Sequence, residues 1–177
     1  MERKELKIPK DRVAVLIGKA GAVKKRLEKK GNIKLDIDSE EGDVVISGDS
    51  VDVYIAQSVI KAIARGVNPE VAIILFNEKN SLELLDIQEY VGKSKKSVMR
   101  IKGRIIGQEG KARKFIESFT ETNIYVYGKT IAIIGELERV SMAKQAIEML
   151  LEGSPHGNVY KWLENKKREL IKRELER

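Results

Sequence analysis

An internal repeat constrains the fold of this chain more than any other feature. The tetrapeptide GKAG at residues 18–21 recurs 89 residues later as GQEG at residues 107–110. The same offset aligns the residues that follow, and after a two-residue shortening it settles at 87. The matched pairs include Leu27 with Ile116, Glu28 with Glu117, Leu35 with Ile124, Ile37 with Val126, Gly48 with Gly135 and Ala56 with Ala143. Matches sustained over so long a stretch indicate a tandem duplication, so one structural unit is expected twice.

The sequence pattern of the first unit predicts alternating helices and strands. Ile33, Leu35 and Ile37 alternate with charged residues, as in a strand with one buried face. Gly31 can end the helix before it in a left-handed conformation, and Ser50 can cap the last helix. The predicted order is a strand at 5–8, a helix at 11–17, a helix at 22–30, strands at 33–37 and 44–47, and a helix after residue 50.

The second unit repeats this order. Strands are predicted at 123–127 and 130–134, joined by a tight Gly128-Lys129 turn, and an apolar stripe marks the helix that follows. Before it, residues 68–76 begin with an Asn-Pro-Glu helix start and residues 81–87 are predicted as its first strand. After it, residues 159–176 are predicted as a helix.

The order strand, helix, Gly-x-x-Gly, helix, strand, strand, helix resembles the type I KH (K-homology) RNA-binding module. The stretches VAVLIGKAGAVKKRLEKKGNIKLDI and GRIIGQEGKARKFIESFTETNIYVYGKTIAIIG both carry the resemblance. It implies an α+β fold of two tandem type I KH domains (βααββα), each a three-stranded antiparallel sheet packed against three helices, plus a C-terminal helix. The implied division is KH domain 1 at 1–67, an ordered linker at 68–80, KH domain 2 at 81–153 and a helical extension at 154–177.

Positive charge gathers around both Gly-x-x-Gly tetrapeptides. Residues 10–30 hold eight basic and two acidic residues, and residues 93–114 hold nine basic residues against Glu109 alone. The whole chain has a formal net charge of only +7, so the rest of it is acidic. Two separate basic blocks predict two surfaces that bind an anionic partner.

A Gly-x-x-Gly between two helices suits a phosphate backbone. Glycine allows a sharp turn and leaves no Cβ to block an approaching chain, and the next helix directs free N–H groups at the loop. In KH modules this loop clamps about four nucleotides of a single strand, while base edges meet an apolar groove. The residues that the motif and the resemblance predict to contact RNA are Ile17, Gly18, Lys19, Ala20, Gly21, Lys24, Lys25 and Leu35 in the first unit, and Gly103, Arg104, Ile105, Ile106, Gly107, Gln108, Glu109, Gly110, Lys111, Arg113, Lys114 and Tyr125 in the second.

Glu109 departs from the basic pattern of the loop. A carboxylate at this position would repel a phosphate unless it points outward, whereas the surrounding positive charge favours its being tolerated. It could also accept a hydrogen bond from a base amino group.

Other function classes find little support in the sequence. Cysteine is absent and His156 is the only histidine, so no zinc site or catalytic triad is expected. The acidic run at 36–43 lacks the glycine and terminal glutamate of a calcium loop and predicts a solvated turn. Tyr160 and Trp162 are expected to pack the tail helix onto the second unit rather than to stack on bases. We expect no enzymatic activity, cofactor or metal. The charged N-terminus and the lack of a long apolar run predict a cytoplasmic protein that is not embedded in a membrane.

The tandem units, the linker and the tail with its Ser-Pro-His-Gly-x-Val-Tyr motif resemble the small-subunit rRNA-processing proteins known as partner of NOB. The resemblance implies binding of single-stranded rRNA near the 3′ end of small-subunit rRNA. The implied partners are the pre-ribosomal small subunit and the endonuclease that makes this 3′ end. Two alternatives stay open: a KH-fold adaptor that binds protein, and a KH subunit of another RNA-processing complex.

Overall fold

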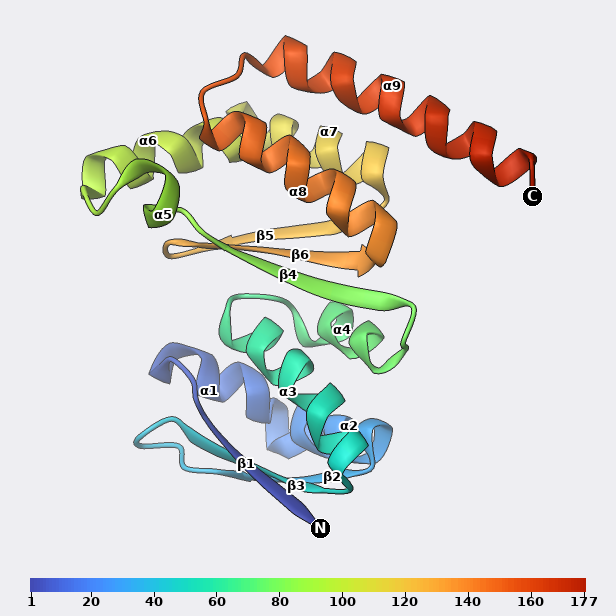
Figure 1. Ribbon diagram of the computed structural model, residues 1–177. Coiled ribbons are helices and arrows are strands. Elements are labelled where there is room, and N and C mark those ends of the chain that lie inside the picture. The colour runs from blue at the N-terminus through green and yellow to red at the C-terminus, as the bar shows by residue number, and fades with distance from the viewer. The chain divides into compact units, whose positions relative to one another are not determined.

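The computed structural model describes all residues, 1–177. The chain forms two compact units, Met1–Leu82 and Glu83–Arg177, and the boundary falls within the first strand of the second unit's sheet (Figure 1). Each has one three-stranded antiparallel sheet with helices on one of its faces (Figure 1).

In the first unit the central strand is the last of the three in the chain, and the sheet order is β1-β3-β2. β1 pairs with β3 along its whole length, from Glu2 opposite Gly48 to Lys7 opposite Asp43. The strand therefore begins earlier than the predicted residue 5, because backbone pairing and not apolar side chains defines it. The elements are β1 (Glu2–Lys7), α1 (Lys10–Ile17), the 3₁₀ turn η1 (Lys19–Gly21), α2 (Ala22–Gly31), β2 (Ile33–Ile37), β3 (Asp43–Gly48), α3 (Ser50–Ala64), α4 (Pro69–Ala72) and the 3₁₀ turn η2 (Ile73–Phe76).

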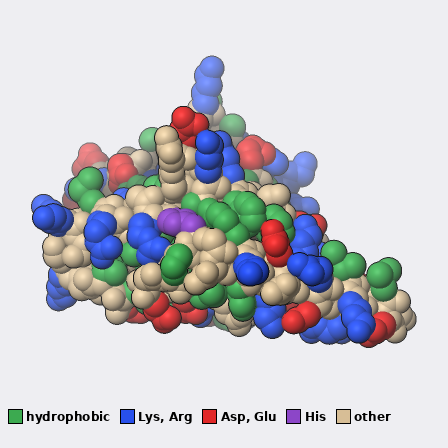
Figure 2. All heavy atoms as spheres, turned by 90° about the horizontal axis from the view of Figure 1, so that it is seen from above, with side chains coloured by type: hydrophobic (Ala, Val, Ile, Leu, Met, Phe, Trp, Pro, Cys, Tyr) green, Lys and Arg blue, Asp and Glu red, His purple; other side chains and the backbone are tan.

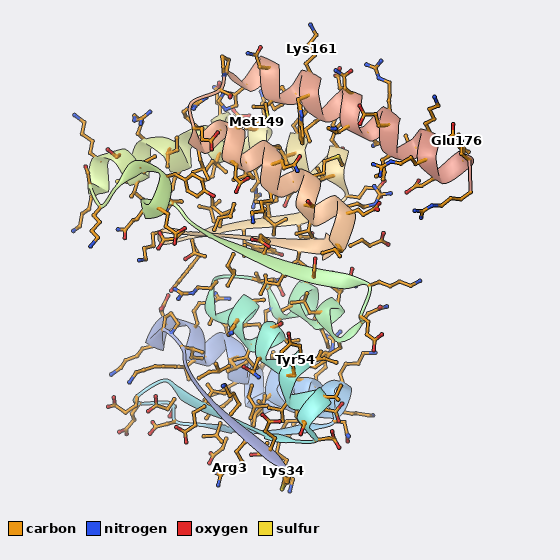
Figure 3. The ribbon with its side chains drawn as sticks, viewed as in Figure 1. Arg3, Lys34, Tyr54, Met149, Lys161 and Glu176 are labelled. Carbon is orange, nitrogen blue, oxygen red and sulfur yellow. The ribbon has the colours of Figure 1, made fainter.

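The predicted alternation in β2 is confirmed. Ile33 and Leu35 are buried, and Lys34 and Asp36 between them are exposed. Lys34 and Arg3 project from the sheet face opposite the helices (Figure 3). Charged residues on one face and branched apolar residues on the other thus determine which side of this sheet the helices cover.

Side-chain caps begin two helices of the first unit. Asn68 accepts a hydrogen bond from the Glu70 N–H at 2.9 Å, with Pro69 at the first helical position, as the sequence predicts. The cap of α3 is Asp49, which accepts from the Val51 N–H, and not the predicted Ser50, which is the first helical residue. Both residue types can cap, and the backbone of Asp49 is the extended one that an N-cap needs.

The second unit has the same plan with one additional long helix. Its sheet order is β4-β6-β5, and it contains β4 (Asn80–Asp86), α5 (Gln88–Val91), α6 (Lys95–Ile106), the 3₁₀ turn η3 (Gln108–Gly110), α7 (Lys111–Thr120), β5 (Asn123–Tyr127), β6 (Thr130–Glu136), α8 (Leu137–Leu151) and α9 (His156–Leu175). Its core includes the fully buried Ile105, Ile116, Ile124, Ile131, Ile133 and Ile147. The predicted α+β fold class is confirmed. The short helix α5 was not predicted.

The duplication extends to individual hydrogen bonds. Glu28 of α2 accepts from the Leu35 N–H at 2.8 Å, and Glu117 of α7 accepts from the Ile124 N–H at the same distance. These residues are offset by 89, as the repeat requires. A helix carboxylate therefore holds the edge strand of each sheet against the helix that follows the Gly-x-x-Gly.

An arginine also binds the carboxyl end of α3 in the first unit and of α8 in the second. Arg12 donates to the carbonyls of Ile63 and Val67, at 2.8 and 3.1 Å. Arg104 donates to the carbonyls of Leu150 and Ser154, at 2.8 and 2.5 Å. The accepting carbonyls correspond in the repeat at the offset of 87. The two arginines do not: at the offset of 89, Arg12 aligns about one helical turn before Arg104. Each guanidinium is an additional donor at a helix end, since the Ile63 and Leu150 carbonyls also accept from the Gly66 and Gly153 N–H groups.

The C-terminal helix α9 packs on the second unit. Val159 and Leu163 are fully buried, and the Tyr160 ring lies 3.9 Å from that of Phe115 in α7, centroid to centroid. Trp162 is half-buried against the same core. The prediction that Tyr160 and Trp162 pack is confirmed, and burial raises the pKa of the Tyr160 phenol.

Candidate nucleic-acid interface

The two Gly-x-x-Gly loops have almost the same backbone. Gly18 and Gly107 have φ/ψ of 72°/175° and 74°/173°, and Gly21 and Gly110 have 75°/14° and 74°/12°. The third residue of each loop is left-handed although it is not glycine: Ala20 has φ 52° and Glu109 has φ 55°. The repeated motif thus builds the same turn twice from different variable residues.

The two glycines of each loop have different roles. A Cβ on Gly107 would lie 2.7 Å from both the backbone nitrogen and the Cβ of Ala112, and a Cβ on Gly18 would lie 2.4 Å from Val23 Cγ2. No atom lies within 4 Å of a Cβ built on Gly21, and only the Lys114 side chain, at 3.7 Å, lies near one on Gly110. The first glycine therefore lets the loop pack on the next helix, and the second leaves an open approach.

The helix after each loop begins without a side-chain cap. Gly21 precedes α2 and Gly110 precedes α7, and neither helix start receives a side-chain hydrogen bond. These amino ends carry a partial positive charge and free N–H groups. An anion on the loop would satisfy them.

Basic side chains surround both helix starts. Lys19, Lys25, Lys111 and Lys114 are exposed and Lys24 is half-buried, and none of the five forms an ion pair. Many Lys and Arg side chains also lie on the face of the second unit seen in Figure 2. Unpaired lysines beside open glycines are suited to successive phosphates.

The edge of β5 lies directly beside α7. Glu117 accepts from the Ile124 N–H, and Arg113 Nη1 lies 3.4 Å from the Ile124 carbonyl oxygen to which it donates. In an antiparallel edge strand, the N–H and C=O of every second residue point away from the sheet. Val126 is two residues after Ile124, so its N–H and C=O point to the same free edge of β5 as those of Ile124. This donor and acceptor can pair with the edge of a base. Ile37 is the equivalent residue in the first unit.

The strand-edge positions Ile37 and Val126 were not among the predicted contacts. Their side chains give no signal, since only backbone atoms take part. The strand order, which shows that β2 and β5 are edges, is what reveals them.

The predicted apolar contacts are placed unevenly. Ile17 and Ile106, directly before the loops, are half-buried and present some surface. Leu35 is only 3% exposed and Ile105 is fully buried, so both belong to the cores. Tyr125 follows Ile124 in β5 and therefore faces away from the core side of the sheet. The structure does not bring Tyr125 together with Ile105.

The guanidinium of Arg104 has a structural position. It donates to the Leu150 and Ser154 carbonyls, and the Arg104 carbonyl lies 2.7 Å from His156 Nε2 and can accept from it. Gly103, its neighbour, is exposed in α6 with no atom within 4 Å of a built Cβ. Arg104 thus joins α6 to the ends of α8 and α9.

The loop side chains are free of internal contacts. Gln108 and Glu109 are exposed, and the structure gives neither side chain a hydrogen bond or an ion pair. Glu109 remains without a neutralising partner although lysines surround it in the sequence. No group of His, Asp and Glu side chains is placed to hold a metal ion, and no helix is long and apolar enough to cross a bilayer.

Comparison with known families and structures agrees with this geometry. A family model described as a KH domain matches residues 3–62, and one described as a eukaryotic-type KH domain (KH-domain type I) matches residues 81–168. A KH domain-containing protein of Methanocaldococcus jannaschii is 51% identical over 173 residues, which cover 95% of this chain and 75% of the relative. The crystal structure of Dim2p from Pyrococcus horikoshii is 44% identical with a TM-score of 0.87, and the match covers 93% of this chain and 99% of that one. The chain belongs to the Dim2p and PNO1 family of KH-domain proteins. The predicted family resemblance is confirmed.

Other members of the family extend the comparison. A complex of a/eIF2α, aDim2p and rRNA from the same Pyrococcus species contains a chain that is 43% identical with a TM-score of 0.88, and the match covers 95% of each chain. The pre-rRNA-processing protein PNO1 of Chaetomium thermophilum is 31% identical over 105 residues, which cover 57% of this chain. The matched part spans only 40% of that relative's own length.

Proposed function

We propose that this protein binds single-stranded rRNA during maturation of the small ribosomal subunit, with each KH unit holding one segment of the strand. The observation that carries the proposal is the open approach to Gly21 and Gly110 beside uncapped helix starts, present twice in one chain. The related Pyrococcus protein occurs in a complex with rRNA, and related PNO1 proteins are pre-rRNA-processing proteins.

Each part of the surface has its own task in this proposal. The backbone of the loop and the helix start hold a phosphate, and Lys19, Lys24 and Lys25, or Lys111 and Lys114, contact its neighbours. Ile17 and Ile106 offer an apolar surface to a base. The edges of β2 and β5 offer backbone donors and acceptors for its polar edge. Arg104 has no RNA contact in this proposal, because its guanidinium donates to the Leu150 and Ser154 carbonyls.

The resemblance supports a more specific assignment. We propose that the RNA is the 3′ end of small-subunit rRNA, bound on the pre-ribosomal small subunit in the cytoplasm. The endonuclease that makes this end is the proposed protein partner. The second unit, which matches the KH pattern over a longer stretch, contributes more of the sequence selectivity.

Loop variants test RNA binding directly. Fluorescence anisotropy would compare the wild type with Lys19→Asp/Ala20→Asp and with Gln108→Asp/Glu109→Asp. The changed side chains are exposed, and aspartate tolerates the left-handed position better than most residues. The fold is therefore expected to be retained. An added charge near a phosphate costs on the order of 1 kcal/mol or more, so affinity should fall about tenfold or more, with the first variant losing more because it reverses a lysine.

The controls separate RNA from other ligands. Binding of a single-stranded RNA with the host's small-subunit 3′ sequence should weaken with salt at a log–log slope of about −0.7 for each phosphate contact. A DNA duplex of the same length should bind more weakly. Loop variants with wild-type RNA affinity, or a response flat in salt, would support the protein-adaptor alternative and contradict the proposal.

A further inference from the structure

The internal repeat allows the outer face of α2 to be compared with that of α7. At the offset of 89, Arg26 corresponds to Phe115 and Lys30 to Phe119. These positions are four residues apart, so they lie together on one side of each helix. The side that faces the edge strand is a different one, since it carries Glu28 and Glu117 with their hydrogen bonds to Leu35 and Ile124.

In the second unit a helix covers this face. The rings of Phe115 and Phe119 stack at 4.4 Å, Tyr160 of α9 lies on Phe115, and the Lys167 ammonium lies 5.2 Å from the centre of the Phe119 ring. α9 buries Val159 and Leu163 in the same packing. The KH unit thus has a helix-docking face on the far side of α7 from the strand edge.

In the first unit the same face borders an open groove of about 920 Å³. One wall is α2, with Arg26, Lys29 and Lys30, and the other is η2, with Ile73, Ile74 and Phe76. The Phe76 ring lies close to Gly31, where a Cβ would come within 2.5 Å of it. The groove therefore has an apolar side and a basic side.

The charge on this face indicates what it can accept. Lys29 and Lys30 are exposed and form no ion pair. Arg26 is paired with the carboxylate of Glu70 from α4, so a carboxylate already lies against this side of α2. Where the second unit uses two phenylalanines to hold a tail helix with an excess of basic residues, the first unit presents Arg26 and Lys30.

We propose that the groove between α2 and η2 is a docking site for an acidic amphipathic helix of a protein partner. The apolar side of that helix lies on Ile73, Ile74 and Phe76, and its carboxylates meet Lys29 and Lys30. α4 and η2 already contact Arg26 and Gly31 of α2, where the start of α9 would lie on α7, and the partner helix occupies the groove that remains beside them. This site is on the opposite side of α2 from the strand edge, so it can be occupied while the first unit holds RNA.

Two peptides made from the sequence of α9 test the proposal. Both keep the apolar stripe of His156–Leu175; one is native, and in the other all six Lys and Arg are replaced by Glu. Each is titrated into the ¹⁵N-labelled full chain, and amide shifts are followed at residues 26–31 and 73–80. We expect the acidic peptide to shift these amides and the native peptide to bind at least about tenfold more weakly, since their charges are opposite.

Charge-reversal variants and RNA complete the test. Lys29→Glu/Lys30→Glu should lower the affinity for the acidic peptide at least about tenfold. The control Lys4→Glu/Lys61→Glu, which has the same net charge, should change that affinity less than about twofold. A single-stranded RNA should shift the loop amides at 18–21 and 107–110 and leave 73–80 unchanged. The proposal is overturned if the acidic peptide leaves 26–31 and 73–80 unshifted, if both peptides bind equally, or if RNA shifts 73–80. RNA binding at the loops is read independently, so its failure does not affect this outcome.

Discussion

Exchanging each glycine of the second loop for alanine should separate folding from RNA binding. Gly107→Ala places a side chain at φ 74°, ψ 173°, a region that only glycine occupies readily, and strain of this kind costs about 1–3 kcal/mol. The new Cβ also lies 2.7 Å from the backbone nitrogen of Ala112, and overpacking adds about 1–3 kcal/mol. The free energy of unfolding should therefore fall by about 2–6 kcal/mol in all.

Gly110→Ala should behave differently. Its φ of 74° and ψ of 12° are left-handed helical, where an alanine costs about 1–2 kcal/mol. Only the flexible end of Lys114 lies near the new methyl group, which otherwise projects into open space. If RNA approaches there, affinity should fall about tenfold or more in a protein that is still folded.

Urea unfolding of the second unit can be followed by its own fluorescence, because Trp162 is the only tryptophan in the chain and packs on that unit's core. RNA affinity is measured by anisotropy under conditions where each variant is folded. Gly103→Ala is the matched control. Gly103 lies in helix α6 with open space around its built Cβ, so the alanine should raise the free energy of unfolding by up to about 1 kcal/mol. Equal destabilisation by Gly107→Ala and Gly110→Ala would refute the assigned roles, as would wild-type RNA affinity in Gly110→Ala.

Three further predictions concern contacts away from the loop. Arg104→Ala removes the side-chain donor of the Leu150 and Ser154 carbonyls, and only Leu150 keeps a backbone donor, the Gly153 N–H. We expect the free energy of unfolding in urea to fall by about 1–3 kcal/mol with RNA affinity of the folded protein unchanged; a selective loss of RNA affinity would contradict this role. Glu117→Gln weakens the acceptor of the Ile124 N–H, and hydrogen exchange at that amide should accelerate, whereas unchanged exchange would show that the bond is not formed. Burial, together with the hydrogen bond to Glu148, raises the pKa of Tyr90 to about 12. Since the unfolded pKa is about 10, the contribution of Tyr90 to stability is complete below pH 10 and is lost as the pH rises toward 12. In an ultraviolet titration, the wild type should show one late-titrating phenol that Tyr90→Phe lacks. Ionisation of Tyr90 near pH 10 would refute the shift.

Much of the fold could be predicted from the sequence because it depends on local physics. The repeat predicted two units, the alternation in β2 predicted its buried face, and the two loops take the same backbone because glycine permits it at the same places. Element ends were predicted less well. β1 begins at Glu2 and not at residue 5, and α9 covers His156–Leu175 and not 159–176, because backbone pairing and Pro155 define those ends.

The candidate site depended more on tertiary structure. In β2, charged residues show which side is buried, and Leu35 is indeed in the core. In β5, the sequence NIYVY is apolar or aromatic at almost every position, so alternation could not show which of Ile124 and Tyr125 faces the core. The local sequence could not assign Arg104 to the end of α8 either, because its acceptors lie 46 and 50 residues further along the chain.

The sequence by itself determined the repeated unit, the loop backbone and the positive charge around it. Only the tertiary structure decided which basic side chains remain available and which faces of α2 and α7 are open. The physical reason is that glycine geometry and strand alternation act between neighbours in the chain. The partner of a guanidinium, or the helix that covers an aromatic face, is set by packing between segments that are distant in sequence.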